Sequence, residues 1–571
     1  MGDVVRENIE TKVLIVGGGP TGLFTSILLS QCRVPHILVE RQVESINAPA
    51  AHVINTRTTE IFRQAGIDMD ALYELDHHPQ ARLVTWSQLP GDPVLGQFDI
   101  KADVEALKLR DSASQDHSAN ISQHLLQRFL RSVAEESEFS DIRFGVNWEG
   151  FTNNQTNVNR VSGINSTSYS IRADYVLAAD GAGSSVSRAL GIKMIGPDHL
   201  ATFLNLSCEV SMDKVSPETG TLLYWLMDPE LRGVVIVHDP KRLAVVMQLI
   251  DVPYESFEDY DDARCQSLLD RIFRGNPYQL IHKGFWRMTA QVAEKFRQDN
   301  VFLIGDAAHR FPPMGGLGLN TAIADAHNLV WKLAATINNK LDAKPQERLL
   351  DSYETERKPV AQRNCDASNR NNQKMIEVVE ALGLDPDKAD LLPRVMNSFL
   401  IRYLPKGLQQ AIKAVLLKPA RSLIAAASAD TQEGEKIRER ISKAVVNQEE
   451  HFSSLGLELG YVYKQGLVSS DAEHTPESNV KDYTPSFGPG ARLPHLAIKR
   501  DGESASLLDF VNYHNFLCLK SGESQDVDFP TFGYPVVELD IAELGVTSID
   551  LTEGDYLLVR PDGHIADRGK P

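Results

Sequence analysis

The sequence predicts an α/β protein with a doubly wound parallel sheet, an inserted mixed β-sheet and a smaller α/β module at the C-terminal end. Three observations support this fold class. A β-α-β unit with a glycine-rich turn occupies Lys12–Glu40, two further buried strands end at Asp180 and at Asp306, and the composition changes from Gln448 onward. Buried parallel strands that alternate with helices are typical of doubly wound sheets.

The composition limits the possible functions. The 571 residues are 42% hydrophobic and 24% charged, as expected for a soluble globular chain that can bury more than one core. A net charge of −19 argues against nucleic acid as a partner. The five cysteines are scattered and form no Cys-x-x-Cys pair, so we expect no disulfide framework and no metal site, and we predict a reducing, cytoplasmic setting. The polar N-terminus and the short first apolar run predict neither a signal segment nor a membrane span.

The first unit has the pattern of a dinucleotide-binding motif. The strand Val13–Val16 leads into the turn at residues 17–22, a helix follows to about Cys32, and a second strand ends at Glu40. In this pattern the first glycine makes the turn, the second lets a pyrophosphate approach the backbone, and the third lets helix and strand pack. The helix N-terminus then faces the phosphates, while the acidic residue suits a ribose diol. The candidate cofactor-binding residues here are Gly17, Gly19, Pro20, Thr21, Gly22, Glu40 and Arg41.

The next helix is predicted to run to about Ala65, and its surroundings contain three ambiguous residues. Arg57, at the helix start, suits a phosphate contact as well as it suits a surface position. His52 titrates near neutrality and is a candidate base, although a hydrogen-bonded structural histidine is the commoner outcome. Gln123, in the first turn of a later amphipathic helix, either hydrogen-bonds a ligand or caps that helix.

The middle of the chain predicts two further pieces of sheet. Residues 72–116 look irregular and polar apart from a strand at Leu83–Trp86, and residues 142–174 alternate as a small antiparallel sheet does. The following strand ends in the turn Asp180-Gly181, which opens a helix and forms a second candidate phosphate region. Strand-like runs between 201 and 285, including Leu222–Met227, then suggest an inserted substrate sheet.

The stretch Val301–Leu333 predicts a buried strand, an acidic strand end, a Pro/Gly loop and a packed helix. An Asp at a strand end can accept a hydroxyl proton, glycines let a flat ligand approach the backbone, and a helix N-terminus favours negative charge. This combination suits a polyol attached to a flat ring that becomes anionic. The alternative is an ordinary strand, turn and helix. The candidate residues are Asp306, Pro313, Gly316, Gly318, Leu319 and Asn320.

The remaining sequence predicts helices and then the C-terminal module. Helices are expected to about Asn338, over Leu349–Met375, and over Leu391–Ala427 with breaks at Pro405 and Pro419. The last of these is basic, and we expect a packed helix with a solvated face rather than a membrane-binding one. After a polar linker, strand-like runs beginning at Phe516, Pro535 and Tyr556 alternate with expected helical stretches.

The three motifs occur in the same order as in the single-component flavoprotein aromatic hydroxylases (class A flavoprotein monooxygenases), and the chain resembles their phenol and chlorophenol hydroxylase branch over essentially its whole length. This resemblance implies a Rossmann-like FAD-binding domain, an inserted mixed β-sheet substrate domain and a C-terminal thioredoxin-like domain. The expected division is 1–200 with insertions near 72–116 and 291–447 for the FAD-binding part, 201–290 for the substrate sheet, and 448–571 for the last domain.

The resemblance also implies roles for the motif residues. The Gly17–Gly22 turn with Glu40 would hold the ADP half of FAD, Arg57 and Gln123 would contact the cofactor, and Asp306 would bind the ribityl chain. The loop from Pro313 to Asn320 would face the isoalloxazine, and Asp180-Gly181 corresponds to the element shared by flavin and NAD(P)H. Because Cys518 is the only cysteine of the C-terminal domain, that domain is expected to be structural or to support a homodimer rather than to catalyse thiol exchange.

The activity implied by the resemblance is hydroxylation of a phenolic or other electron-rich aromatic substrate through a C4a-hydroperoxyflavin, with O2 and NAD(P)H as co-substrates. His52 is the first choice for the base that activates the phenol, Trp286 is expected to shape the pocket, and Tyr224 is expected to lie opposite the flavin. Two alternatives stay open: decarboxylative hydroxylation, epoxidation or ketone oxygenation of a larger secondary metabolite, and a non-catalytic flavin-binding protein.

Overall fold

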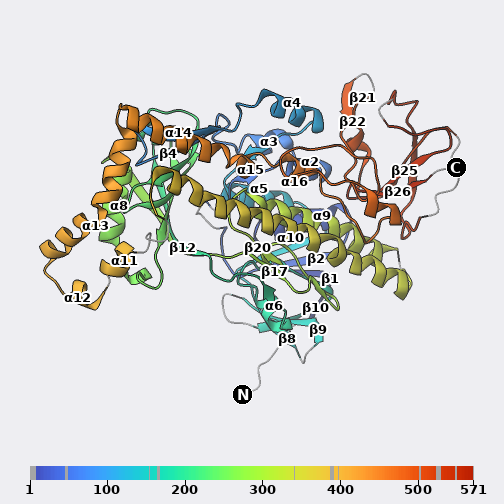
Figure 1. Ribbon diagram of the computed structural model, residues 1–571. Coiled ribbons are helices and arrows are strands. Elements are labelled where there is room, and N and C mark those ends of the chain that lie inside the picture. Colours follow the sequence, from blue (N-terminus) through green and yellow to red (C-terminus); the bar gives the residue numbers. More distant parts are fainter. Residues whose placement is uncertain are drawn as a thin grey trace, which may run out of the picture.

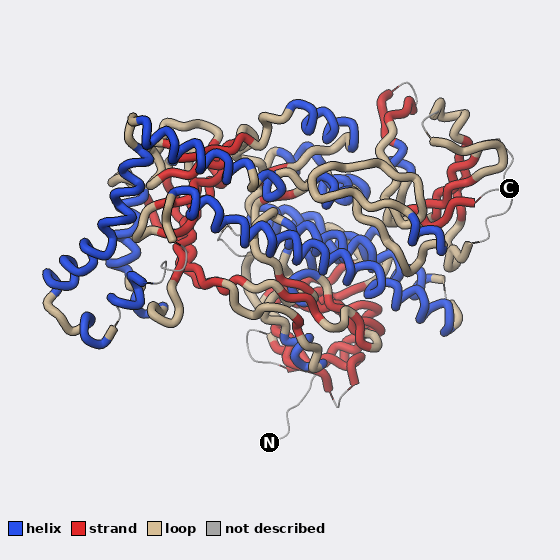
Figure 2. The backbone as a smooth tube through the Cα atoms, in the orientation of Figure 1, coloured by secondary structure: helices blue, strands red, loops and turns tan. Residues whose placement is uncertain are grey.

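The computed structural model describes residues 8–45, 49, 51–152, 155–163, 168–339, 341–385, 391–396, 398–500, 503–522, 529–546 and 549–569. Two long helices, α9 and α10, run across the middle of the molecule, between a sheet with α8 and α13 at one end and the C-terminal strands β25 and β26 at the other (Figure 1). Strands are concentrated in separate groups, which Figure 2 shows in red. This arrangement is the mixed α/β fold that the sequence predicts.

The nucleotide-binding type of sheet has the strand order β18-β19-β10-β1-β2-β7. All of its neighbouring strands are parallel except β18, which is antiparallel to β19. The carboxyl ends of β1, β10 and β19 therefore meet at one edge, where ligands bind in open α/β sheets. The strands are β1 (Asn8–Val16), β2 (His36–Glu40), β7 (Ser140–Phe144), β10 (Ser168–Ala178), β18 (Arg297–Gln298) and β19 (Val301–Leu303). Helices α1 (Pro20–Gln31), α5 (Gln123–Glu135) and α9 (Leu317–Asn338) pack beside this sheet.

The second large sheet has the order β16-β12-β15-β14-β13-β4-β5. Its core strands come from the predicted insertion: β12 (Ala201–Val210), β13 (Thr221–Met227), β14 (Arg232–Asp239), β15 (Leu243–Ile250) and β16 (Tyr278–Met288). Helix α8 (Asp262–Ile272) shares a hydrophobic core with one face of this sheet. The antiparallel strands β8 (Asn147–Thr152) and β9 (Gln155–Ser162) extend β10 of the first sheet, as expected for residues 142–174.

The predicted strand at Leu83–Trp86 is confirmed as β4 (Leu83–Ser87), but the expectation that the rest of residues 72–116 is irregular was wrong. Strand β5 (Val94–Asp99) pairs with β4 at the edge of the second sheet, and α4 spans Val104–Ala113. The start of α4 has an ordinary capping signal, because the Asp103 carboxylate accepts hydrogen bonds from the backbone N–H groups of Glu105 and Ala106. The polar surface of α4 concealed this signal. The residues nevertheless join the substrate-type sheet, as the predicted insertion requires.

The helical region also differs from the prediction at one proline. Helix α10 (Ala343–Leu382) contains Pro359, and α13 (Lys406–Ser428) continues through Pro419 although a break was predicted there. An internal proline removes one helical hydrogen bond. In α13, Leu417 and Ile424 are 4% and 2% exposed on either side of the proline, so packing holds both halves in one helix. Helices α11 (Leu391–Met396), α12 (Phe399–Arg402) and α14 (Gln432–Val446) complete the region.

The C-terminal module contains a four-stranded sheet of order β24-β23-β25-β26. Its strands are β23 (Phe516–Lys520), β24 (Val536–Asp540), β25 (Tyr556–Val559) and β26 (Ile565–Gly569). The expected helical stretches between these strands are not found in the described residues, and the short 3₁₀ helix η5 (Leu507–Phe510) lies before β23. The sheet is compatible with a thioredoxin-like arrangement, which stays a prediction.

The C-terminal module shares its core with the helices of the FAD-type domain. Trp331 of α9 packs edge-on against Phe516. The Glu356 carboxylate of α10 accepts hydrogen bonds from Lys332 Nζ and from Arg560 Nη1, both at 2.7 Å, and all three side chains are fully buried. Removing one partner of a buried ion pair leaves an uncompensated charge, so this cluster fixes the module on α9 and α10.

Candidate active site

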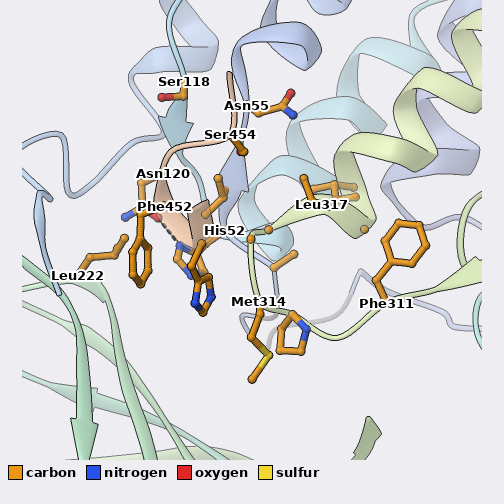
Figure 3. A pocket seen from close by; sticks show the side chains of 18 of the residues that line it. His52, Asn55, Ser118, Asn120, Leu222, Phe311, Met314, Leu317, Phe452 and Ser454 are labelled. Atoms are coloured by element: carbon orange, nitrogen blue, oxygen red, sulfur yellow. Dashed lines mark hydrogen bonds between the residues drawn. The ribbon is translucent and has the colours of Figure 1, made fainter. Parts of the chain in front are cut away.

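A cavity of about 940 Å³ lies between the edge of the first sheet and one face of the second sheet. One wall comes from the glycine-rich turns of the first sheet and from the loop before α9, and the other comes from β12–β16. Figure 3 shows His52 and Asn120 on one side of this space and Met314, Phe311 and Leu317 on the other. The volume is at the upper end of the range for small-molecule sites.

The turn before α1 has the geometry that its three glycines predict. A Cβ at Gly17, which has φ +114°, would lie 2.3 Å from the carbonyl oxygen of Ala179, and a Cβ at Gly22 would lie 2.0 Å from the carbonyl oxygen of Gly17. A Cβ at Gly19 would have no atom within 4 Å. Two glycines are thus required for packing of the protein, whereas Gly19 leaves open space at the N-terminus of α1. No side chain caps that helix end, so its backbone N–H groups remain for a ligand.

Pro20 and Thr21 line the cavity beside Gly19. Glu40 lies behind this turn, where its two carboxylate oxygens accept hydrogen bonds from the backbone N–H groups of Gly18, at 2.7 Å, and Gln42, at 2.8 Å. A carboxylate oxygen has more than one lone pair, so a ribose hydroxyl can still donate to Glu40. Arg41 is exposed next to it. Their contacts with a nucleotide stay predictions.

The loop between β19 and α9 forms the centre of the cofactor-facing wall. Gly305 has φ +61°, and Asp306 has an exposed side chain that lines the cavity. Pro313, Gly318 and Leu319 also line it. The N-cap of α9 is Gly316 with φ +63°, a left-handed conformation that favours glycine, and no side chain caps this helix. The end of α9 therefore directs unpaired N–H groups toward the loop.

A buried ionic cluster holds this loop from behind. The Asp325 carboxylate of α9 accepts hydrogen bonds from the backbone N–H of Gly305 at 3.2 Å, from His309 Nε2 at 2.6 Å and from Arg357 Nε at 2.9 Å. Although burial opposes ionisation, His309 and Arg357 lower the pKa of Asp325 below its ordinary value. No sequence motif predicts this pairing, because its members lie on separate elements.

These features fit FAD. The open space at Gly19 and the uncapped α1 accommodate a pyrophosphate, and Asp306 accommodates a polyol hydroxyl. The glycine loop before α9 admits a flat ring, while the helix end stabilises negative charge on it. A phosphate next to Gly19 would displace no side chain, because that space is empty.

Two predicted cofactor residues have their side chains engaged elsewhere. The Arg57 guanidinium is buried and donates to Glu60 and to the backbone carbonyl of Asp562, so we no longer expect it to contact the cofactor. Asn320 is also buried: its Oδ1 accepts from the Asn55 N–H, and its Nδ2 donates to the Gly316 carbonyl at 2.6 Å. Neither side chain lines the cavity. Asn320 instead fastens the start of α9.

In the turn Asp180-Gly181, the aspartate stabilises a helix and the glycine lines the cavity. Asp180 caps α6 (Ser185–Leu190) through hydrogen bonds that its Oδ2 accepts from the Ser185 and Val186 N–H groups, at 2.7 and 3.2 Å. Gly181, with φ +78°, lines the cavity. Gln123 lines it as well, and its Oε1 accepts a hydrogen bond from the Ala51 N–H.

The opposite wall consists of large side chains on alternate positions of the second sheet. Trp286 of β16 stacks on Phe203 of β12 with ring centroids 5.8 Å apart, and both line the cavity. Trp225 of β13 lines it too. The prediction for Tyr224 was wrong, because successive strand residues point to opposite faces. Tyr224 is 2% exposed and packs in the core on the far face, with Val235. Alternation in the sequence separates Tyr224 from Trp225 but does not show which of the two faces the cavity.

His52 lies at the border of the two walls with its ring half-buried. Its Nδ1 is 2.5 Å from Oδ1 of Asn120, the contact drawn as a dashed line in Figure 3. The ring of His238 stands edge-on to it, with centroids 5.0 Å apart. Enclosure by protein lowers the pKa of His52 below 6.5, although Asn120 and Asp76 act in the opposite direction. The imidazole is therefore neutral at physiological pH.

Matches to known protein families agree with this geometry. Residues 10–368 match the FAD binding domain family, and residues 487–570 match the family of aromatic-ring hydroxylase C-terminal domains. The first match covers more than half of the chain. The chain belongs to the FAD-dependent aromatic hydroxylases, the class A flavoprotein monooxygenases, as the order of its motifs predicts.

Individual relatives agree with this assignment. The chain is 25% identical to 2,4-dichlorophenol 6-monooxygenase of Delftia acidovorans, over 98% of this chain and 95% of the relative. It is 34% identical to a putative polyketide hydroxylase of Streptomyces coelicolor, over 62% of this chain and 56% of the relative. Among solved structures, the flavin-dependent monooxygenase PieE in complex with FAD and substrate superimposes with a TM-score of 0.83 at 26% identity, covering 99% of this chain and 96% of PieE.

The protein is therefore an FAD-dependent monooxygenase that uses O2 and reduced pyridine nucleotide, and the non-catalytic alternative is set aside. Among the described helices, none combines the length and apolar character required to cross a bilayer. The His, Cys, Asp and Glu side chains of the described ranges include no group that could hold a metal ion.

Proposed function

We propose that this monooxygenase hydroxylates a phenolic substrate that is held between Trp286, Trp225 and the loop before α9, and that His52 takes the phenolic proton. The observation that carries the proposal is the position of a neutral imidazole in the same cavity as the cofactor loop. Removal of the phenolic proton makes the ring a stronger nucleophile, and a positioned base contributes about 10²- to 10⁴-fold to such a step.

The protein and the cofactor have separate tasks. Bound FAD supplies hydride acceptance from NAD(P)H and activation of O2 for transfer of one oxygen atom to the ring. The N–H groups at the start of α9 would favour negative charge on the flavin ring, and Asp306 would accept a hydrogen bond from its polyol. Trp286 and Phe203 hold the substrate ring and exclude water. We assign the turn from Gly17 to Gly22 to the pyrophosphate.

A larger substrate is the second candidate. The cavity is also lined by Leu107 and Leu109 of α4 and by Phe452, so it offers more room than a single phenol ring fills. The similarity to a putative polyketide hydroxylase supports this candidate. Decarboxylative hydroxylation, epoxidation and ketone oxygenation of such a compound would use the same wall, and they differ in the mass of the product.

A substrate screen tests the proposed function. Purified holoenzyme is given phenol, 2,4-dichlorophenol, 1-naphthol and polycyclic phenols, with NADH or NADPH, and O2 consumption and product mass are recorded. We expect substrate-stimulated oxidation of the nucleotide and a product heavier by one oxygen atom, together with a rate that falls about 100-fold in His52→Gln. Stimulation by none of the phenols would refute the phenolic assignment, while an unchanged rate and pH profile in His52→Gln would refute the base.

We further propose a homodimer and a cytoplasmic location. The five cysteines are free and buried, as suits a reducing compartment, and Cys518 lies inside the C-terminal sheet. A single sedimenting species of one chain would refute the dimer.

A further inference from the structure

His52 and Asn120 are joined by backbone as well as by side chain. The short strands β3 (Val53–Ile54) and β6 (Ala119–Asn120) pair antiparallel, with Val53 opposite Asn120. Next to this pair, the Ile121 N–H donates to the His52 carbonyl at 2.8 Å. The backbone N–H of Asn120 donates to Asp76 at 2.9 Å. The backbone of both residues is therefore held by strand pairing, so the two side chains meet in a fixed geometry.

The hydrogen bond between them determines which ring nitrogen carries the proton. Oδ1 of Asn120 is a carbonyl oxygen and can only accept, so Nδ1 of His52 must donate. In a neutral imidazole the other nitrogen, Nε2, then has the free lone pair. Among the described residues, no protein group makes a hydrogen bond to Nε2, and the half-buried ring lines the cavity.

We propose that Asn120 is a positioning residue that keeps His52 in the tautomer with Nε2 directed at the substrate, so that Nε2 accepts the phenolic proton. This inference rests on the proposed function of His52 as the base. Asn120 does not touch the reacting atoms in this account, and it acts through the proton on Nδ1. Loss of such an orienting partner leaves an imidazole that can present the wrong nitrogen.

The environment of Asn120 argues against a purely stabilising role. Its amide Nδ2 is buried and has no hydrogen-bond partner within the described ranges. A buried donor without a partner costs about 1–3 kcal/mol, so the amide Nδ2 adds no stability at this position. The amide oxygen, by contrast, has the single short contact with His52. Position 120 therefore requires an acceptor oxygen for His52, and this requirement, rather than stability, accounts for the asparagine.

The groups that face His52 set the sign of the pH effects. Asp76 raises the pKa of His52, and His78 lowers it, while burial of His238 beside the ring keeps that second imidazole neutral. Replacing Asn120 by Leu removes a partner that raises the pKa of His52, so the acid limb of the rate profile moves to lower pH. Replacing it by Asp adds a negative charge at the same acceptor position, so the limb moves to higher pH.

The test compares Asn120→Leu with the acceptor-retaining Asn120→Asp. In single turnovers of reduced holoenzyme with 2,4-dichlorophenol, we expect the hydroxylation rate to fall about 10-fold in Asn120→Leu. In Asn120→Asp most of the rate should return, with the acid limb displaced upward. FAD content and the rate of flavin reduction should match the wild type in both variants. A ¹⁵N-histidine NMR spectrum, with His52→Gln to assign the signal, reports the tautomer without turnover and should show protonated Nδ1 in wild type and a mixture in Asn120→Leu.

The outcomes separate the two proposals. A His52→Gln enzyme that loses its rate while Asn120→Leu keeps the wild-type rate, pH profile and tautomer would overturn the role of Asn120 and leave the base in place. Wild-type behaviour of His52→Gln itself would overturn the proposed function. If 2,4-dichlorophenol is not turned over, a protonated Nε2 in the wild-type NMR spectrum would overturn the inference, and protonated Nδ1 that is lost in Asn120→Leu would support it.

Discussion

The two walls of the cavity differ in whether they present backbone groups or side chains to a ligand. The cofactor-facing wall presents backbone, with glycines at 19, 181, 315, 316 and 318 and the uncapped ends of α1 and α9. The substrate-facing wall consists of side chains that alternate along β12 to β16, among them Trp225 and Trp286, with His52 at the border. A backbone wall recognises one ligand in one geometry, whereas a side-chain wall can change by substitution while the sheet stays the same.

This difference explains why relatives of one fold carry names with different substrates. Every glycine of the first wall is constrained by atoms of the protein or by the space for the cofactor. The tryptophans of the second wall are constrained only by the need to fill space. We therefore expect substitutions in the first wall to remove the cofactor or the fold, and substitutions in the second wall to change substrate preference.

The sharpest pair of variants lies in a single turn. A methyl group at Gly22 would collide with the Gly17 carbonyl, so Gly22→Ala should lower the free energy of unfolding by about 3 kcal/mol or more. A methyl group at Gly19 would meet no protein atom. Gly19→Ala should therefore keep the stability of the apoprotein and weaken FAD binding at least about 10-fold, or about 1.4 kcal/mol. Chemical denaturation and FAD titration measure the two effects, and equal stability losses in both variants would contradict the distinction.

The second prediction concerns the polyol contact. Because Asp306 is the carboxylate of the cofactor loop that lines the cavity, Asp306→Ala should be purified as apoprotein. Asp306→Asn keeps a hydrogen-bond acceptor and should retain part of the FAD. The absorbance ratio of bound flavin to protein gives the occupancy. Full occupancy in Asp306→Ala would show that the ribityl chain lies elsewhere.

The third prediction compares the two faces of β13. Trp225→Ala should raise KM for the best phenol about 10-fold with a small loss of stability, since it removes a cavity wall. Tyr224→Ala should lower the free energy of unfolding by about 3 kcal/mol, since it opens a hole in the core on the far face, and the folded enzyme should keep its KM. Steady-state kinetics beside urea unfolding distinguishes them. The reverse pattern would mean that Tyr224 faces the substrate.

The same contrast sets the limit of what the sequence predicts. The need for glycine at 17 and 22 could be predicted because each satisfies a local requirement of backbone geometry that a short motif displays, whereas the cofactor roles of Glu40 and Asp306 stay predictions. The substrate wall could not be assigned, because one residue of strand register separates Tyr224 from Trp225. Contacts between distant segments were also missed: Arg57 donates to the backbone carbonyl of Asp562 in the C-terminal module, and Asp325 joins His309 to Arg357. No local pattern encodes such partners.

Element boundaries show a similar division. The sequence predicted the end of α9 at Asn338 and the helix after Asp180, where apolar spacing and turn residues agree. It failed for α4, whose surface is polar, and at Pro419, where packing on both sides outweighs the local cost of proline. Tertiary packing decided both cases.

His52 lies at the border of the two walls, and we propose that its neutral imidazole takes the proton of a phenol bound between them. The most direct test is the pH dependence of the single-turnover hydroxylation rate, with wild type and His52→Gln measured in parallel on the best phenol from the screen. Because burial lowers the pKa of His52 below 6.5, the base is unprotonated through neutrality, and the wild-type rate should stay level there and fall only on the acid side. In His52→Gln this acid limb should disappear. An acid limb of the same midpoint and amplitude in both enzymes would contradict the account.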